Sequence, residues 1–301
     1  MMNNQLWQEM QEAGIAPAEP LGLLQNGELQ RYQVANDKQG TKNGWLVSHI
    51  NAGSPNVYVF GSWKTGSNHT VVEGGVSNMD QNTRFLIEQA QRQAKLKKEH
   101  EQLAVAQECA RIWRTLPPAN DHPYLNAKGI QAHIARRWNE SLVIPLINFN
   151  MTITSLQFIS LTGGKVFRKG GKVNGSFCQL GGAEFTNSKT WVVCEGYATG
   201  ASIHEATGLP VLVAFNANNL KPVATSLRLA TPAAKLIIAA DNDRFTSIGN
   251  VGVKKAEDAA RGASAYVVIP QFETDEGTDF NDLAQQKGLQ QITEIFQEVA
   301  A

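Results

Sequence analysis

The stretch TWVVCEGYATGASIHEATGLPVLVAFNANNLKPVATSLRLATPAAKLIIAADND, residues 190–243, decides the fold. Short apolar runs of strand formers, such as WVVC at 191–194 and KLIIAA at 235–240, alternate in it with segments of helical pattern. Near-continuous apolar strands that alternate with amphipathic helices are typical of a parallel sheet covered on both faces. The alternation continues through KKAEDAARG, AYVVIPQ and a final helix ending in ITEIFQEVA, so we expect an α/β domain with a mostly parallel sheet.

Acidic residues follow the predicted strands of this region. Glu195 follows the first strand, and Asp241 and Asp243 follow the third. Asp279 and Asp282 lie in the turn after the fourth. Because parallel strands end at the same edge of a sheet, we expect these carboxylates to meet in one cleft. Each acid alone is also typical of a turn or a helix N-cap, but the set favours a site for Mg²⁺, which prefers hard oxygen ligands.

The motifs VVCEGYATGAS, LIIAADND and TDFNDL resemble the TOPRIM domain of bacterial primases, topoisomerases and some nucleases, in its phage and plasmid primase variant. The resemblance covers about residues 188 to 290. It implies that Glu195 acts as general acid or base in nucleotidyl transfer. It also implies that Asp241 and Asp243 bind Mg²⁺, or Mn²⁺ in its place, with Glu195 as a further ligand. Asp279 matches another acid of the family and is expected to join the metal site.

Three upstream segments are similar to the region that precedes TOPRIM in those primases: HPYLNAKGI at 122–130, LVIPLIN at 142–148 and LQFISLTGGKVFRKGGKVNGSF at 156–177. The resemblance implies a basic cleft for a single-stranded DNA template and ribonucleoside triphosphates. Lys165, Arg168, Lys169 and Lys172 form a dense positive cluster on Gly-rich turns, where cations can approach a phosphate backbone. The alternative is a solvated hairpin tip.

The chain length of 301 residues suits about two domains of usual size, and the changes of pattern along it predict four parts. Residues 1–78 contain short strands broken by turns and predict a small α+β module. Residues 79–118 predict a long helical spacer, made of one long helix or two abutting ones, because 80–115 contain neither Gly nor Pro. Residues 119–187 predict a basic α+β primase-type subdomain with an antiparallel meander, and 188–301 predict the TOPRIM domain.

Net charge is zero, with 27 basic and 27 acidic residues, which argues against a general polyanion binder. The first 185 residues nevertheless carry +4 and the remainder −4, so a basic half precedes an acidic half. The three cysteines are far apart and form no CxxC pair, so we expect reduced thiols, no structural zinc and a cytoplasmic protein. No apolar run is long enough to predict a membrane span.

Together these features favour a primase-type nucleotidyltransferase that makes short RNA primers in phage or plasmid replication. No GxxxxGKS/T phosphate-binding loop occurs, so any helicase is expected to be separately encoded. Two alternatives stay open at this stage. One is a TOPRIM metal-dependent nuclease, and the other is a nucleic-acid-binding protein without catalytic activity.

Overall fold

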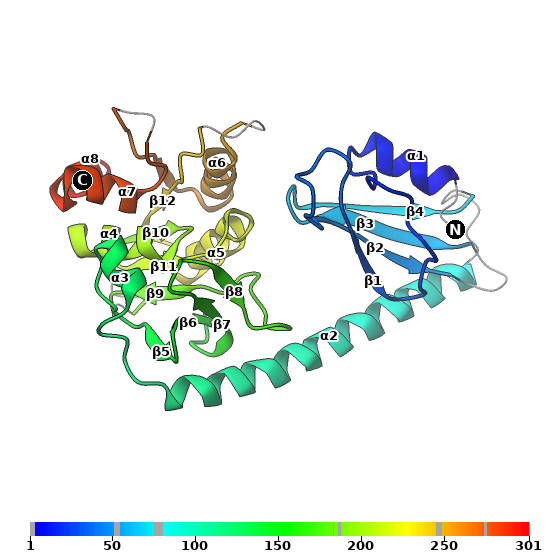
Figure 1. Ribbon diagram of the computed structural model, residues 1–301, viewed down its shortest axis with the longest axis horizontal. Helices are drawn as coiled ribbons and strands as arrows, with labels where there is room; N and C mark the ends of the chain where they lie inside the picture. Colours follow the sequence, from blue (N-terminus) through cyan, green and yellow to red (C-terminus); the bar gives the residue numbers. More distant parts are fainter. Residues whose placement is uncertain are drawn as a thin grey trace. The chain divides into compact units, whose positions relative to one another are not determined.

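The computed structural model describes residues 4–50, 55–74, 81–182, 184–185, 188–244, 249–273 and 276–300; for residues 81–91, 93, 94 and 300 only the backbone is described. The chain forms two compact units, Met1–Leu96 and Lys97–Ala301 (Figure 1). Each unit has its own buried core, and they are described separately below. The four-part division by residue number stays a prediction.

The first unit is an antiparallel sheet with one helix on it. Its strands are β1 (Leu29–Tyr32), β2 (Gly44–His49), β3 (Val57–Ser62) and β4 (Ser67–Val72), in the order β1-β2-β3-β4. Helix α1 (Asn4–Glu12) buries Leu6 and Met10 in a core that includes Leu46 and Phe60. The predicted α+β character of this part is therefore confirmed.

The Gly- and Pro-free segment forms one long helix, α2 (Gln81–Thr115), as expected. Its C-terminal part belongs to the second unit, where Cys109 is buried against Val143 and Leu156. These two residues lie on β6 (Ser141–Ile147) and β7 (Ile153–Ile159). This part of α2 therefore covers one face of the antiparallel sheet to which those strands belong.

That antiparallel sheet has the order β5-β6-β7-β8, with β5 (Arg136–Trp138) and β8 (Lys165–Phe167) at its edges. Helix α3 (Pro123–Lys128) precedes it. The meander predicted from the sequence ends earlier than expected. Strand β9 (Cys178–Leu180) leaves it and pairs antiparallel with β11 (Val211–Val213) of the next sheet, because Cys178 and Leu180 bury their side chains in the core of that sheet.

The next sheet has the order β13-β12-β10-β11-β9. Strands β10 (Thr190–Cys194), β11, β12 (Lys235–Ala239) and β13 (Tyr266–Val268) are parallel, and only the edge strand β9 is antiparallel. The α/β architecture with a mostly parallel C-terminal sheet is therefore confirmed, including the predicted strand and helix alternation.

Helices cover both faces of this sheet. One face packs on α4 (Tyr197–Thr207), α7 (Phe280–Lys287) and α8 (Leu289–Ala300), and the other on α5 (Ala217–Ala230) and α6 (Val251–Ala263). Alternate residues of β10 divide between the two cores: Cys194 joins the α4 side and Val193 the α5 side. Helix α4 approaches the sheet closely at Gly200, where an added Cβ would lie 2.7 Å from Cγ2 of Val213.

All three cysteines are buried and unbridged, which agrees with the expectation of reduced thiols. Burial raises the pKa of the Cys109 thiol to about 11, so this group is protonated at neutral pH. Among the helices in the described ranges, none combines the length and the apolar character needed to cross a membrane.

Candidate active site

The carboxyl ends of the parallel strands bring the predicted acids to one edge of the sheet. Cys194 pairs with Ala239 in the β10–β12 register, and Ala239 pairs with Val268 of β13. Glu195, which follows β10, and Asp241, which lies two positions beyond β12, therefore stand on neighbouring strand ends. The expectation that strand ends would collect these carboxylates agrees with this register.

Glu195 lies between the N-termini of two helices. Gly196 is the N-cap of α4, and the backbone amide of Ala217, the first residue of α5, donates a hydrogen bond to the Glu195 carboxylate. Helix N-termini favour negative charge. Burial and the nearby Asp243 carboxylate act more strongly in the opposite direction, and together they raise the pKa of Glu195 to about 7. Glu195 can therefore exchange a proton near neutral pH.

Asp241 is the more strongly perturbed acid. Burial, followed by the negative charges of Glu195, Asp279 and Asp243, raises the pKa of Asp241 to about 8. Its Oδ1 atom is buried and has no hydrogen-bond partner. A buried carboxylate oxygen without a partner is costly, so the position calls for a proton or a cation.

Asn242, between the two aspartates, fixes the turn that carries them. Its backbone amide donates to the Thr278 carbonyl at 2.7 Å, and its side-chain Nδ2 donates to the Pro270 carbonyl at 3.0 Å. Its Oδ1 accepts a hydrogen bond of 2.7 Å from Asn250, the N-cap of α6. Sequence reasoning missed Asn242, because two of its partners, Pro270 and Thr278, lie far along the chain and leave no local pattern.

Asp279 is the N-cap of α7, and its Oδ1 accepts hydrogen bonds from the backbone amides of Asn281 and Asp282. Its charge also contributes to the raised pKa values of Glu195 and Asp241, so it lies beside them. Asp279 therefore caps a helix, which was the alternative for these acids, and it also lies close to the other acids.

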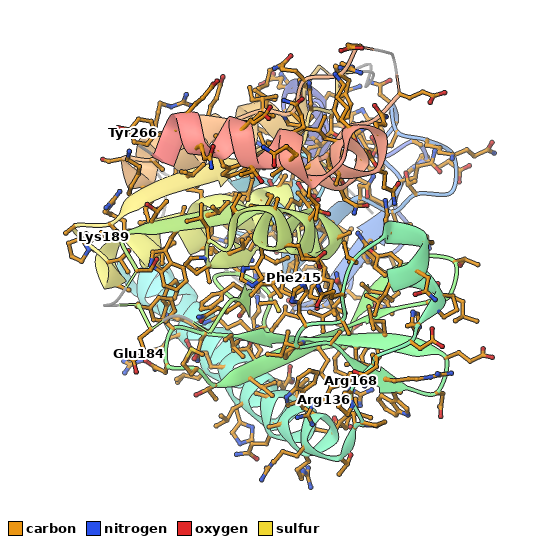
Figure 2. The ribbon with its side chains drawn as sticks, turned by 90° about the vertical axis from the view of Figure 1, so that its left-hand side faces the viewer. Arg136, Arg168, Glu184, Lys189, Phe215 and Tyr266 are labelled. Carbon is orange, nitrogen blue, oxygen red and sulfur yellow. The ribbon has the colours of Figure 1, made fainter. Side chains whose placement is uncertain are left out.

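The four basic residues of the predicted cluster differ in their surroundings. Lys165, on β8, opposes the rise in the pKa of both Glu195 and Asp241, so its ammonium group lies near them. Arg168 forms an ion pair of 2.7 Å with Glu108 of α2. Lys169 and Lys172 are exposed in the turn that follows β8. Of these four residues, Lys165 is thus a leading electrostatic influence on the acids, and Figure 2 labels Arg168, which follows β8.

Phe215 is a strained residue at the same strand edge, labelled in Figure 2. It has a φ of 70°, a left-handed conformation that is rare for an aromatic side chain. Its backbone amide donates to the Glu195 carbonyl oxygen at 2.8 Å, and its ring meets the edge of Phe167 with centroids 5.9 Å apart. The strain therefore belongs to the turn that holds Glu195, and no sequence pattern indicated it.

Asn281 links the upstream segment to this edge. It is fully buried, and its Nδ2 donates to the Lys128 carbonyl at 2.7 Å and to Oγ of Ser202 at 2.9 Å. The α3 segment HPYLNAK thereby packs against the start of α7. Tyr124 of α3 is buried as well, and burial together with the Asp279 charge raises its pKa to about 12. His122 is the N-cap of α3, and its side chain accepts a hydrogen bond from the backbone amide of Tyr124.

The carboxylates supply the hard oxygen donors that a divalent cation requires, and the partnerless Oδ1 of Asp241 fits such a ligand. As the side chains stand, no three His, Cys, Asp or Glu residues within the described ranges are close enough together to hold a metal ion. The assignment of Glu195, Asp241, Asp243 and Asp279 as metal ligands stays a prediction.

Comparison with known proteins agrees with this geometry. Residues 190–290 match the family described as Toprim domain, which includes β10 through α7 and all of the acids above. The chain is also 32% identical over 271 residues to an Escherichia coli DNA primase TraC, covering 86% of this chain and 19% of that protein. A second E. coli DNA primase TraC is 30% identical over 265 residues, with coverage of 83% and 24%.

The chain thus spans about a fifth of the length of these curated relatives. Among solved structures, the primase fragment of the bacteriophage T7 primase-helicase protein is 19% identical with a TM-score of 0.44. That match covers 57% of this chain and 72% of the fragment.

Proposed function

We propose that this chain, whose residues 190–290 are a Toprim domain, is a primase-type nucleotidyltransferase that makes RNA primers on single-stranded DNA. The observation that carries the proposal is the convergence of Glu195, Asp241 and Asp243 at one sheet edge, with Lys165 of the preceding subdomain beside them. Carboxylates that can bind a metal ion, together with the Lys165 ammonium group, can stabilise the negative charge of a polyphosphate during its reaction.

The similarity to the TraC primases favours synthesis over cleavage. It extends over 271 residues, far beyond the Toprim match of residues 190–290. The segment that supplies Lys165 and α3 is therefore expected to act together with the Toprim domain. A nuclease that used the Toprim carboxylates alone would not require this partner.

In the proposed reaction the 3′ hydroxyl oxygen of the growing primer attacks the α-phosphorus of a ribonucleoside triphosphate. The bond from that phosphorus to the bridging oxygen breaks, and pyrophosphate leaves. Glu195 accepts the hydroxyl proton, a role that its pKa of about 7 suits. Lys165 offers positive charge to the triphosphate, and the exposed Lys169 and Lys172 contact the template backbone together with Arg168.

Asp241 and Asp243 would hold the divalent cation, with Glu195 and Asp279 near it. When bound, Mg²⁺, or Mn²⁺ in its place, would neutralise charge on the phosphates. Asn242 keeps the two aspartates in place through its bonds to Pro270 and Asn250. The setting that we propose is phage or plasmid replication in the cytoplasm, with a separately encoded helicase as a partner.

A single assay tests the reaction class. The chain is incubated with end-labelled single-stranded DNA, Mg²⁺ and four ribonucleoside triphosphates, of which one carries a second label. Template-dependent labelled ribonucleotide products support the proposal. Shortened DNA without such products would favour the nuclease alternative, and binding without either product would favour a protein that only binds nucleic acid.

A further inference from the structure

The sheet of the first unit has two different faces. The face toward α1 carries Leu46, Tyr58 and Phe60, which are buried with Leu6 and Met10. Side chains alternate along a strand, so the other face carries the residues between them. The register pairs Arg31 with Trp45 and Trp45 with Gly61 across β1, β2 and β3.

Two indoles and a guanidinium group gather on that second face. The ring centroids of Trp45 and Trp63 are 6.1 Å apart at an interplanar angle of 38°. The guanidinium carbon of Arg31 lies 4.6 Å from the centroid of the Trp63 ring. Trp63 is 44% exposed, whereas tryptophan side chains are highly buried on average. We call Arg31, Trp45, Gly61 and Trp63 the aromatic face.

A glycine and a backbone carbonyl group hold the side chains of the aromatic face in position. A Cβ at Gly61 would lie 2.7 Å from Cζ2 of Trp45, so the indole lies directly over this glycine. Arg31 is held in place because its Nη2 and Nε donate to the Lys42 carbonyl at 2.8 and 3.2 Å. Both aromatic and cationic groups are thus positioned in advance, which lowers the entropy cost of binding a ligand.

We propose that the aromatic face binds single-stranded DNA, with a base stacked on the exposed indole of Trp63 and phosphates contacted by Arg31 and Lys42. Flat aromatic surfaces flanked by cations bind single strands because every base offers a π face. Lys64, which follows Trp63 in the chain, pairs with the Asp37 carboxylate, so these two charges offset each other. The choice of DNA over RNA as the ligand rests on the proposed function. The stacking of a base on Trp63 is independent of that function.

The first experiment locates the DNA on the full chain. Oligo(dT) that carries 5-iodouracil is photo-cross-linked to the protein, and the cross-linked peptides are identified by mass spectrometry. The expected result is a cross-link to Trp63 or Trp45 in addition to those in the second unit. Cross-links confined to residues 97–301 would overturn the inference.

The second experiment measures affinity by fluorescence anisotropy with a labelled oligo(dT). Trp63→Ala is expected to weaken binding about tenfold, in the range found for loss of one base–aromatic stack, and Trp63→Phe to keep most of the affinity. Leu23→Ala, at a position that is 86% exposed in the same unit, is the matched control and should bind normally. Circular dichroism verifies that each variant is folded. Unchanged affinity of folded Trp63→Ala would contradict the proposal.

Two further arms separate this inference from the proposed function and from RNA binding. Asp241→Asn is expected to lose primer synthesis and to keep the cross-link to the aromatic face. Primer synthesis without that cross-link would refute the DNA contact alone, and the cross-link without primer synthesis by the wild-type chain would refute the proposed function alone. Tighter binding of oligo(rU) than of oligo(dT) at the aromatic face would overturn DNA as its ligand.

Discussion

Asn281 donates a hydrogen bond of 2.7 Å to the carbonyl oxygen of Lys128, a residue 153 positions away in the chain. Asn281 is fully buried, and its bond joins α3 to α7, the helix whose N-cap is Asp279. The bond shows that α3, which precedes the residues 190–290 that match the Toprim family, packs against the start of α7 beside the acids. The two segments therefore form one structural unit around the candidate site.

The first prediction concerns this link. Asn281→Ala removes the donor to Lys128 and Ser202 and leaves buried polar groups without partners, which should lower the free energy of unfolding by about 1–3 kcal/mol. Urea denaturation of the second unit measures the change. Gln285→Ala is the control, because Gln285 bonds to the same α3 segment at Ala127 but is exposed, and its loss should change stability by less than about 0.5 kcal/mol. Equal effects of the two substitutions would contradict the buried role of Asn281.

The second prediction concerns stability and pH without added metal. The pKa of Asp241 is about 8 in the folded chain and about 3.8 when unperturbed. Between these values the folded state holds a proton that the unfolded state has lost, so stability should fall as the pH rises from about 4 to about 8. Asp241→Asn removes this group and should melt at a higher temperature than the wild type at pH 8 in EDTA, by differential scanning fluorimetry. A lower melting temperature of the variant under these conditions would show that the charge is not costly.

The third prediction concerns the cation. Mg²⁺ should raise the melting temperature of the wild type at pH 8, because binding to the folded state relieves the repulsion among Glu195, Asp241 and Asp243. The increase should be smaller at pH 5.5, since Glu195 and Asp241, whose pKa values are about 7 and about 8, must lose their protons to bind a cation. Asp241→Asn should abolish most of the increase. Asp258→Asn, which alters an exposed acid paired with Lys221, should leave it intact.

The fourth prediction concerns Lys165. Its positive charge lowers the pKa of Glu195 and of Asp241, so Lys165→Met should raise both further. The acidic limb of the pH–rate profile for primer synthesis should therefore move to higher pH. Lys172→Met provides the control, because Lys172 lies in the turn after β8 and is not among the leading causes of either shift. If the acidic limb of the Lys165→Met profile lay at the wild-type pH, Lys165 would have no effect on the pKa values of these acids.

Much of the second unit could be predicted from the sequence, because its parallel strands are apolar on both faces and its helices are amphipathic. The meeting of Glu195 with Asp241 also followed, since residues after parallel strands share an edge. The path of β9 was not predictable, because a three-residue strand carries no signal for the sheet that it joins. A β-strand pattern gives the local conformation but not the partner.

The residues that support the site could not be predicted either, because their partners are distant in the sequence. Asn242 bonds to Pro270 and Asn281 bonds to Lys128, and contacts between such distant positions leave no periodicity. The strain at Phe215 is a property of the folded backbone. The ion pair of Arg168 with Glu108 depends on the packing of α2, so the Gly-rich turn that carries Arg168 could not predict it.

The most direct test of the central claim is primer synthesis by Glu195→Gln. This substitution keeps the size of the side chain and removes the group that accepts the proton. The proposal predicts a folded variant with unchanged far-ultraviolet circular dichroism and no detectable ribonucleotide products on single-stranded DNA, while Glu298→Gln, at an exposed position of α8, works normally. Synthesis by folded Glu195→Gln at the wild-type rate would contradict the claim.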